Sequence, residues 1–247
     1  MIKSDNKYFL QKNYVMKWYE VDYLGILKPA SLLNYLQDIA TASADKIGFG
    51  TDFTIPRNYA WFLIKYHMEF SEYPKNFDEV TLKTEARGCS KILAFRDFEL
   101  WNKEKCIGRI SSQWMMINLE DKKFLPLSKM NIMPEVEQRE DDLRFTKVVQ
   151  LEEYDSEKEF EIRYDDLDIN RHVNNANYIV WAFETIEKDF RSTHKLKTLD
   201  LVYKKEVTYG HNVISKIKID NLKTHHLLTN KDTGESLCII DAQWEEL

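Results

Sequence analysis

The sequence has few cysteines, no long apolar run and no excess of positive charge. Its 247 residues include three cysteines, which are widely spaced and form no CxxC pair, so neither a disulfide framework nor a zinc site is indicated. No apolar run reaches about 18 residues, and the first seven residues contain no apolar signal core, so we expect no membrane insertion and a cytoplasmic location. The net charge of -6 argues against a nucleic-acid partner.

The first half of the chain reads as one helix followed by an antiparallel meander. A strand is predicted over 13–22, and a helix over 30–46, where apolar residues recur at three- and four-residue steps. Segments rich in aromatic and β-branched residues then follow, separated by short polar turns. We expect strands near 59–71, 79–88, 92–102 and 105–119.

The second half repeats this order of elements. Residues 126–157 show little periodicity and are predicted to be a linker over the surface. A strand near 158–164, a helix over 175–190, and strands near 197–208, 212–221, 224–230 and 235–245 follow it. An offset of 146 residues places Asp22 on Asp168, and places Leu24 and Ile26 where the second half has Asn170 and His172. The chain therefore reads as two related α+β units, each with a curved antiparallel sheet around one helix.

The densest group of chemically useful side chains lies in residues 164–178. If residues 168–172 are extended, Asp168, Asn170 and His172 fall on one face, and Ile169 faces the core with its apolar neighbours. A carboxylate, an amide and an imidazole beside a helix start can polarise a carbonyl and move a proton. The remaining acids and amides of the run fit a turn that caps the helix.

These residues resemble the acyl-acyl carrier protein thioesterases, a family with two fused hot-dog domains. The run from Asp168 to Tyr178 looks like that family's D-x-N-x-H-V-N-N-x-x-Y motif. Weaker matches are Tyr19-Glu20-Val21-Asp22, the helix start from Pro29, and Tyr203-Lys204-Lys205-Glu206. The resemblance implies a tandem double hot-dog, with an N-terminal domain over 1–125, the linker over 126–157 and a catalytic C-terminal domain over 158–247.

The resemblance also implies roles for individual residues. The catalytic set would be Asp168, Asn170, His172 and Glu206, with no cofactor and no metal. Plant members have a cysteine directly after the glutamate; here it is Val207, which has no nucleophilic atom, so a cysteine mechanism is excluded. Asp168 or Glu206 would activate water or attack the thioester directly, and both routes stay open.

Substrate contacts are expected in both halves. The backbone amides of Asn174 and Asn175 at the helix start could bind the oxyanion. The first unit would house the acyl chain, with Trp61 and Phe62 in its pocket. An acidic carrier protein bearing an acyl-phosphopantetheine should dock on a basic patch. Its candidate residues are Arg171, Arg191, Lys195, Lys197, Lys204 and Lys205.

The predicted reaction is hydrolysis of fatty acyl-acyl carrier protein (acyl-ACP) to a free fatty acid and the holo-carrier. Three alternatives remain: the same hydrolysis on acyl-coenzyme A, dehydration of a 3-hydroxyacyl thioester, and acyl binding without catalysis. Oligomeric state stays open, with a homodimer among the alternatives.

Overall fold

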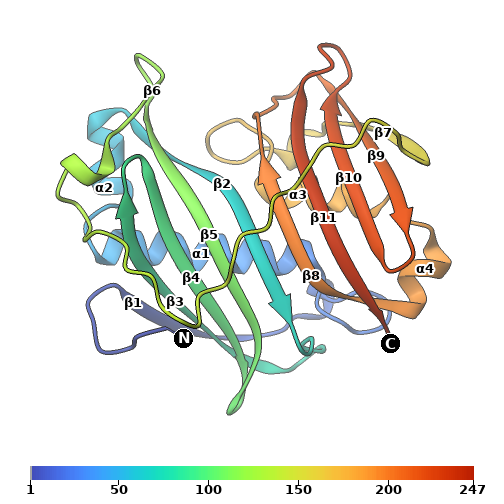
Figure 1. Cartoon of the computed structure of the whole chain (residues 1–247), viewed down its shortest axis with the longest axis horizontal. Coiled ribbons are helices and arrows are strands. Elements are labelled where there is room, and N and C mark those ends of the chain that lie inside the picture. Colours follow the sequence, from blue (N-terminus) through green and yellow to red (C-terminus); the bar gives the residue numbers. More distant parts are fainter. Residues whose placement is uncertain (1) are drawn as a thin grey trace. The chain divides into compact units, whose positions relative to one another are not determined.

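Residues 2–247 are described by the computed structural model, in which the chain divides into two units (Figure 1). Unit 1 takes the residues up to Lys28 and Asn34–Phe145. Unit 2 takes Pro29–Leu33 and Thr146–Leu247.

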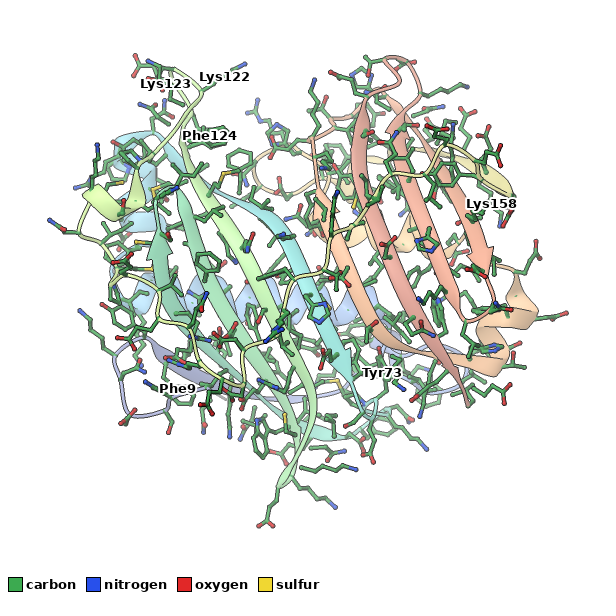
Figure 2. All side chains as sticks on the ribbon, viewed as in Figure 1. Phe9, Tyr73, Lys122, Lys123, Phe124 and Lys158 are labelled. Atoms are coloured by element: carbon green, nitrogen blue, oxygen red, sulfur yellow. The ribbon has the colours of Figure 1, made fainter. Side chains whose placement is uncertain are left out.

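Unit 1 is built on an antiparallel sheet with the strand order β1-β3-β4-β5-β2 (Figure 1). Its strands are β1 (Phe9–Val15), β2 (Tyr59–Phe70), β3 (Glu79–Ser90), β4 (Leu93–Asn102), β5 (Lys105–Asn118) and β6 (Lys123–Phe124), which pairs with β5. The predicted meander is therefore confirmed. Figure 2 shows Lys122, at the end of the β5–β6 connection, next to Lys123 and Phe124 of β6.

The strand predicted over 13–22 is wrong in its second half. After β1 the chain enters a 3-10 turn, η1 (Trp18–Glu20), in which the Glu20 carboxylate accepts a hydrogen bond from the Lys17 N–H at 2.6 Å. This local side-chain to backbone bond competes with continued strand pairing. The strand therefore begins earlier than predicted and ends before the turn.

The part of the helix α1 (Pro29–Lys46) that belongs to unit 1, from Asn34 onwards, lies across one face of the unit 1 sheet (Figure 1). Proline at its first turn fits the helix start, where a missing N–H costs nothing. Leu36 and Ile39 are completely buried, as the apolar stripe predicts. Gly48, with φ at +84°, follows its end in a conformation that favours glycine.

The chain after β5 stays packed on unit 1 as far as residue 145. Glu135 forms a parallel bridge with Cys89, and a Cβ at Gly88 would come within 2.6 Å of the Pro134 carbonyl oxygen. The Glu85 carboxylate, which is 4% exposed, accepts two hydrogen bonds of 2.8 Å from Arg139. Residues 126–145 thus lie against β3, and the short helix η3 (Leu127–Lys129) lies within them.

Unit 2 has the same kind of sheet, with the order β8-β11-β10-β9-β7. Its strands are β7 (Ser156–Glu161), β8 (His194–Tyr203), β9 (Asn212–Asp220), β10 (Lys223–Asn230) and β11 (Ser236–Glu246). The helix α3 (Asn175–Phe183) packs on β9 and β10, and buries Ile179 and Ala182.

The helix predicted over 175–190 is interrupted in the structure. It ends at Phe183, and α4 (Lys188–Thr193) starts after Glu187, whose backbone is extended. The Thr185 hydroxyl donates to the Ala182 carbonyl, and side-chain bonds of this kind compete with regular helix geometry. Ile186 is buried at the break, so the apolar periodicity of the sequence extends past the end of the helix at Phe183.

No helix in residues 2–247 combines the length and the apolar character needed to cross a bilayer.

Candidate active site

The sequence run 168–172 forms a tight turn in unit 2. Leu167 bridges Val173, the Asp168 N–H donates to the His172 carbonyl oxygen at 2.7 Å, and Arg171 has φ at +66°. The extended conformation considered above is therefore wrong. Ile169, expected to face the core, is 95% exposed at the tip of the turn.

The Asp168 carboxylate organises this turn. One oxygen accepts hydrogen bonds from the backbone N–H groups of Asn170 at 2.8 Å and His172 at 3.3 Å, and the other accepts from the Asn170 amide at 3.3 Å. The three predicted residues are thus brought together by hydrogen bonds to one carboxylate. Strand alternation plays no part in it.

Unit 1 contains the same turn without the chemistry. The Asp22 carboxylate accepts from the N–H groups of Leu24 at 2.9 Å and Ile26 at 3.0 Å, and the Asp22 N–H donates to the Ile26 carbonyl at 2.8 Å. Gly25, with φ at +75°, occupies the position of Arg171. The aspartate therefore holds the turn in both units, whereas the amide and imidazole occur only in unit 2.

Glu206 reaches His172 from the segment that follows β8. The Val173 N–H donates to the Val207 carbonyl at 3.0 Å, and His172 bridges Thr208, so the two segments run side by side. His172 Nδ1 and Glu206 Oε2 lie 3.4 Å apart, with side chains 34% and 44% exposed. Val207 is buried, so its side chain points away from this pair.

The environment of Glu206 favours its neutral form. Partial burial raises the pKa of the Glu206 carboxyl, the negative charge of Asp168 adds to the rise, and His172 acts against it. A raised pKa brings a carboxylate closer to the range in which it exchanges protons at neutral pH. Because His172 is the one partner of the carboxyl among residues 2–247, the carboxyl keeps lone pairs for water or substrate.

The start of α3, a few residues after His172, offers one backbone donor. Asn174 caps the helix through its side chain, which accepts from the Ala176 N–H at 2.9 Å, and its own N–H donates to the Asp166 carbonyl at 2.8 Å. Within residues 2–247 no hydrogen bond uses the Asn175 N–H. Of the two amides considered above, Asn175 is the one that remains available for an oxyanion.

Two tyrosines, the buried Tyr178 and the half-buried Tyr203, pack together at the start of α3. Tyr178 is 2% exposed, its ring lies 5.5 Å from that of Tyr203, and the Tyr203 hydroxyl donates to the Asn175 carbonyl at 2.8 Å. Burial raises the pKa of Tyr178, so its hydroxyl stays neutral. The motif contained Tyr178, but only the structure shows that Tyr203 fixes the first residue of α3.

The basic candidates divide into paired and unpaired residues. Lys195 and Lys197 lie 3.3 and 3.5 Å from Glu245, Arg191 lies 3.2 Å from Glu184, and Lys205 pairs with Glu235. For Arg171 and Lys204 the described part of the chain supplies no acidic partner. Both are exposed, and Arg171 belongs to the catalytic turn itself.

An apolar cavity of about 90 Å³ lies in unit 1 between α1 and the sheet. Trp61 forms part of its wall and donates its indole N–H to the Phe49 carbonyl at 2.9 Å, whereas Phe62 is not among the lining residues. Sequence reasoning missed another lining residue, Arg96 of β4. The sequence contained one indication of this residue: Arg96 is charged, but it lies between Ala94 and Phe98 in a row of alternate positions that are expected to be buried.

Across residues 2–247, no three acidic, histidine or cysteine side chains converge in a way that could hold a metal ion.

The two units and the polar turn define the class of protein. Residues 7–133 match the family model described as the acyl-ACP thioesterase N-terminal domain, and residues 129–246 match the acyl-ACP thioesterase C-terminal domain. The chain belongs to the acyl-ACP thioesterase family.

Curated relatives are similar over most of this chain. An oleoyl-acyl carrier protein thioesterase of Coriandrum sativum is 29% identical over 223 residues, which cover 79% of this chain and 58% of that protein. A palmitoyl-acyl carrier protein thioesterase of Cuphea hookeriana is 27% identical over 259 residues, with 95% and 61% covered. The chain spans about three fifths of the length of the curated relatives it matches.

Solved structures confirm the predicted tandem double hot-dog fold. A Lactobacillus plantarum protein described as an oleoyl thioesterase aligns with a TM-score of 0.88 and 23% identity, covering 99% of this chain and 98% of that one. A Bacteroides thetaiotaomicron acyl-ACP thioesterase aligns with a TM-score of 0.84 and 24% identity, covering 99% and 100%.

Proposed function

We propose that this chain hydrolyses the thioester of fatty acyl-ACP, releasing a free fatty acid and the holo-carrier. The observation that carries the proposal is the His172–Glu206 pair, 3.4 Å apart, in a chain of this family. It is supported by the start of α3, where no hydrogen bond within residues 2–247 uses the Asn175 N–H. A titratable pair and an oxyanion donor are the two elements that acyl transfer to water requires.

The geometry supports separate roles for Glu206, Asn175, His172 and Asp168. Glu206 takes a proton from water, the hydroxide oxygen attacks the thioester carbon, and the Asn175 N–H stabilises the oxyanion. The C–S bond then breaks, and His172 supplies a proton to the departing thiolate. The two carboxylate oxygens of Asp168 accept hydrogen bonds from three N–H donors. We therefore assign Asp168 to positioning the turn and Glu206 to the role of general base.

The direct route, in which a carboxylate attacks to form an acyl anhydride, gives the same products. Hydrolysis in ¹⁸O-labelled water under single turnover separates the two. Direct attack by water places the label in the fatty acid in the first turnover. Carboxylate attack followed by water opening the anhydride at the enzyme carbonyl carbon gives an unlabelled fatty acid and leaves the label in the enzyme carboxylate.

We assign the acyl chain to unit 1 and the chemistry to unit 2. The cavity beneath α1 is walled by Trp61, Phe49 and Trp114, and such apolar surface suits a hydrocarbon chain. We propose the N-terminal domain over 1–125 for chain binding and the C-terminal domain over 158–247 for catalysis. A homodimer and a cytoplasmic location stay predictions.

Carrier docking is proposed for Arg171 and Lys204, the two exposed candidate cations with no acidic partner among residues 2–247. Arg171 and Lys204 flank the motif and the segment of Glu206, so a carrier bound there would present its thioester near the site. Arg191, Lys195, Lys197 and Lys205 already pair with acids, which reduces the charge that they offer. Electrostatic docking of this kind should weaken as salt is raised.

A substrate panel tests the function. Matched acyl chains on the carrier protein and on coenzyme A are compared by kcat/KM, with products identified by mass spectrometry. Free fatty acid and a preference for the carrier support the proposal, and a strong preference for the coenzyme overturns the carrier assignment. An enoyl thioester product would indicate a dehydratase, and ligand retention without turnover would indicate a binding module.

A further inference from the structure

The unit 1 cavity exists because small side chains face one another across the helix and the sheet. Ala40 and Ala44 of α1 lie opposite Ala86 of β3 and Ala94 of β4. Large residues at these positions would fill the space by ordinary packing. The aromatic side chains that complete the wall are Phe49, Trp61 and Trp114.

One charged side chain is part of this lining, which is otherwise apolar apart from Thr41. Along β4, Ala94, Arg96 and Phe98 alternate on the buried face, as the period of two requires. Arg96 is 8% exposed and borders the cavity. Arginine is almost never buried without a partner, so a charge at this core position needs a physical reason.

The surrounding protein satisfies little of the guanidinium. Its hydrogen bond goes to the Thr84 hydroxyl at 3.0 Å, and a guanidinium has five donors. Across residues 2–247 it forms no ion pair. Asp97, the next residue, accepts hydrogen bonds from Arg87 and from Ser111, so its charge is already engaged.

The charge persists at neutral pH. Burial lowers the pKa of Arg96 to about 10, while Tyr66 and Asp97 act against that shift. The cavity is therefore bordered by a cation. An uncompensated buried cation is strongly unfavourable, and an oxygen acceptor within reach removes much of that penalty.

A second polar group lies in the same cross-strand row. Tyr66 of β2 is paired in register with Ser112 of β5, which is paired with Arg96 of β4. The Tyr66 hydroxyl is buried and has no hydrogen-bond partner within residues 2–247. The Arg96 guanidinium and the Tyr66 hydroxyl thus lie in one cross-strand row of the unit 1 sheet, the unit assigned to the acyl chain. Both have donors that no hydrogen bond uses within residues 2–247.

We propose that Arg96 makes this cavity a subsite for an oxygen atom carried on an aliphatic chain. The ligand class is an acyl chain with a hydroxyl or carboxylate oxygen that accepts hydrogen bonds from the guanidinium. The proposal rests on the assignment of the cavity to the acyl group. The acceptor has two sources: an oxygenated acyl chain of the substrate, or the carboxylate of a free fatty acid.

The test uses ligand binding and turnover on the whole chain. Calorimetry measures the binding of a fatty acid, its neutral methyl ester, and a series with one hydroxyl at successive chain positions. Turnover compares the carrier thioesters of the plain and hydroxylated acids. The variants are Arg96→Met, which keeps the length and loses the donors, Arg96→Lys, which keeps the charge, and Arg144→Met as an exposed control.

The wild-type protein is expected to prefer one oxygenated ligand by tenfold or more. If the substrate supplies the acceptor, a hydroxylated acyl carrier thioester shows that preference in kcat/KM. If the free acid supplies it, the acid binds at least tenfold more tightly than its methyl ester. Arg96→Met should abolish the preference, Arg96→Lys should retain part of it, and Arg144→Met should leave it unchanged.

The absence of a preference in the wild-type protein overturns the proposal, whether or not the variants fold. It is overturned equally if Arg96→Met folds with an unchanged preference. Arg96-dependent binding without turnover of any acyl carrier thioester would remove the proposed function and leave the subsite standing. Turnover without any Arg96-dependent preference would overturn the subsite and leave the proposed function standing.

Discussion

Replacement of Glu206 by glutamine should separate catalysis from stability. The side chain is 44% exposed and lies 3.4 Å from His172 Nδ1. Coulomb's law gives about 1.2 kcal/mol for two unit charges at that separation in water, and exposed pairs contribute roughly 0 to 1 kcal/mol after solvent screening. The Glu206→Gln variant should therefore keep its free energy of unfolding within about 1 kcal/mol of wild type.

Its activity should fall much further. Glutamine keeps the shape of the side chain but cannot accept a proton, and a general base contributes about 10² to 10⁴ in rate. That loss corresponds to about 2.7 to 5.4 kcal/mol in the barrier, at about 1.36 kcal/mol for each factor of ten. The expected effect on kcat/KM therefore exceeds the effect on folding.

The assay follows thiol release from acyl-ACP with a chromogenic reagent, and urea unfolding measures stability in parallel. His172→Gln and the double variant complete a cycle. Because the two residues act as a unit, the double variant should lose little more than either single one. Turnover within threefold of wild type, or a loss that follows unfolding, would refute the assignment of Glu206.

Other perturbations test the pH dependence, the packed segment and the turn. Because the Glu206 pKa is raised and its carboxylate is the active form, kcat/KM should fall with decreasing pH at values above the ordinary glutamate range of about 4.3, as a pH–rate profile would show. Arg139→Met removes the cation from the buried Glu85 carboxylate, which keeps hydrogen bonds from the Lys3 N–H and the Asn6 amide, and should cost about 3 kcal/mol in urea unfolding, with partial recovery on adding Glu85→Gln. Burial acts to raise the Glu85 pKa, but hydrogen bonds led by Arg139 hold it below its usual value, so this stabilisation is present above the unfolded pKa and is lost as pH falls through the folded one. Arg171→Gly should raise KM for the carrier without lowering the melting temperature, because glycine readily adopts its φ of +66°. Asp168→Asn should lose far less activity than Asp168→Ala if the residue mainly holds the turn, and equal losses would show that its charge takes part in the chemistry.

Local patterns predicted most elements of this fold. The helix over 29–46 and the strands from β2 to β5 and from β8 to β11 follow from periodicity and turn residues, because burial of one face imposes the period on the sequence. The failures occurred where side chains bond to nearby backbone. Glu20 closes a 3-10 turn where a strand was expected, and Thr185 bonds within the interrupted helix.

The residues of the candidate site were available from the motif, but their arrangement was not. A period of two placed Asp168, Asn170 and His172 on one face of a strand, whereas the structure gathers them around a carboxylate in a turn. Hydrogen bonds between residues close in sequence determine this arrangement, and strand geometry does not. The same error placed Ile169 in the core, although it is exposed at the tip.

The sequence by itself determined the two-unit organisation and the family, because repeated periodicity and a specific motif are local properties of the chain. Its offset of 146 residues also matched the two turns at Asp22 and Asp168. Only the tertiary structure decided that Glu206 meets His172, that no hydrogen bond within residues 2–247 uses the Asn175 N–H, and that Arg96 borders an apolar cavity. These depend on contacts between segments distant in sequence, which no local pattern encodes.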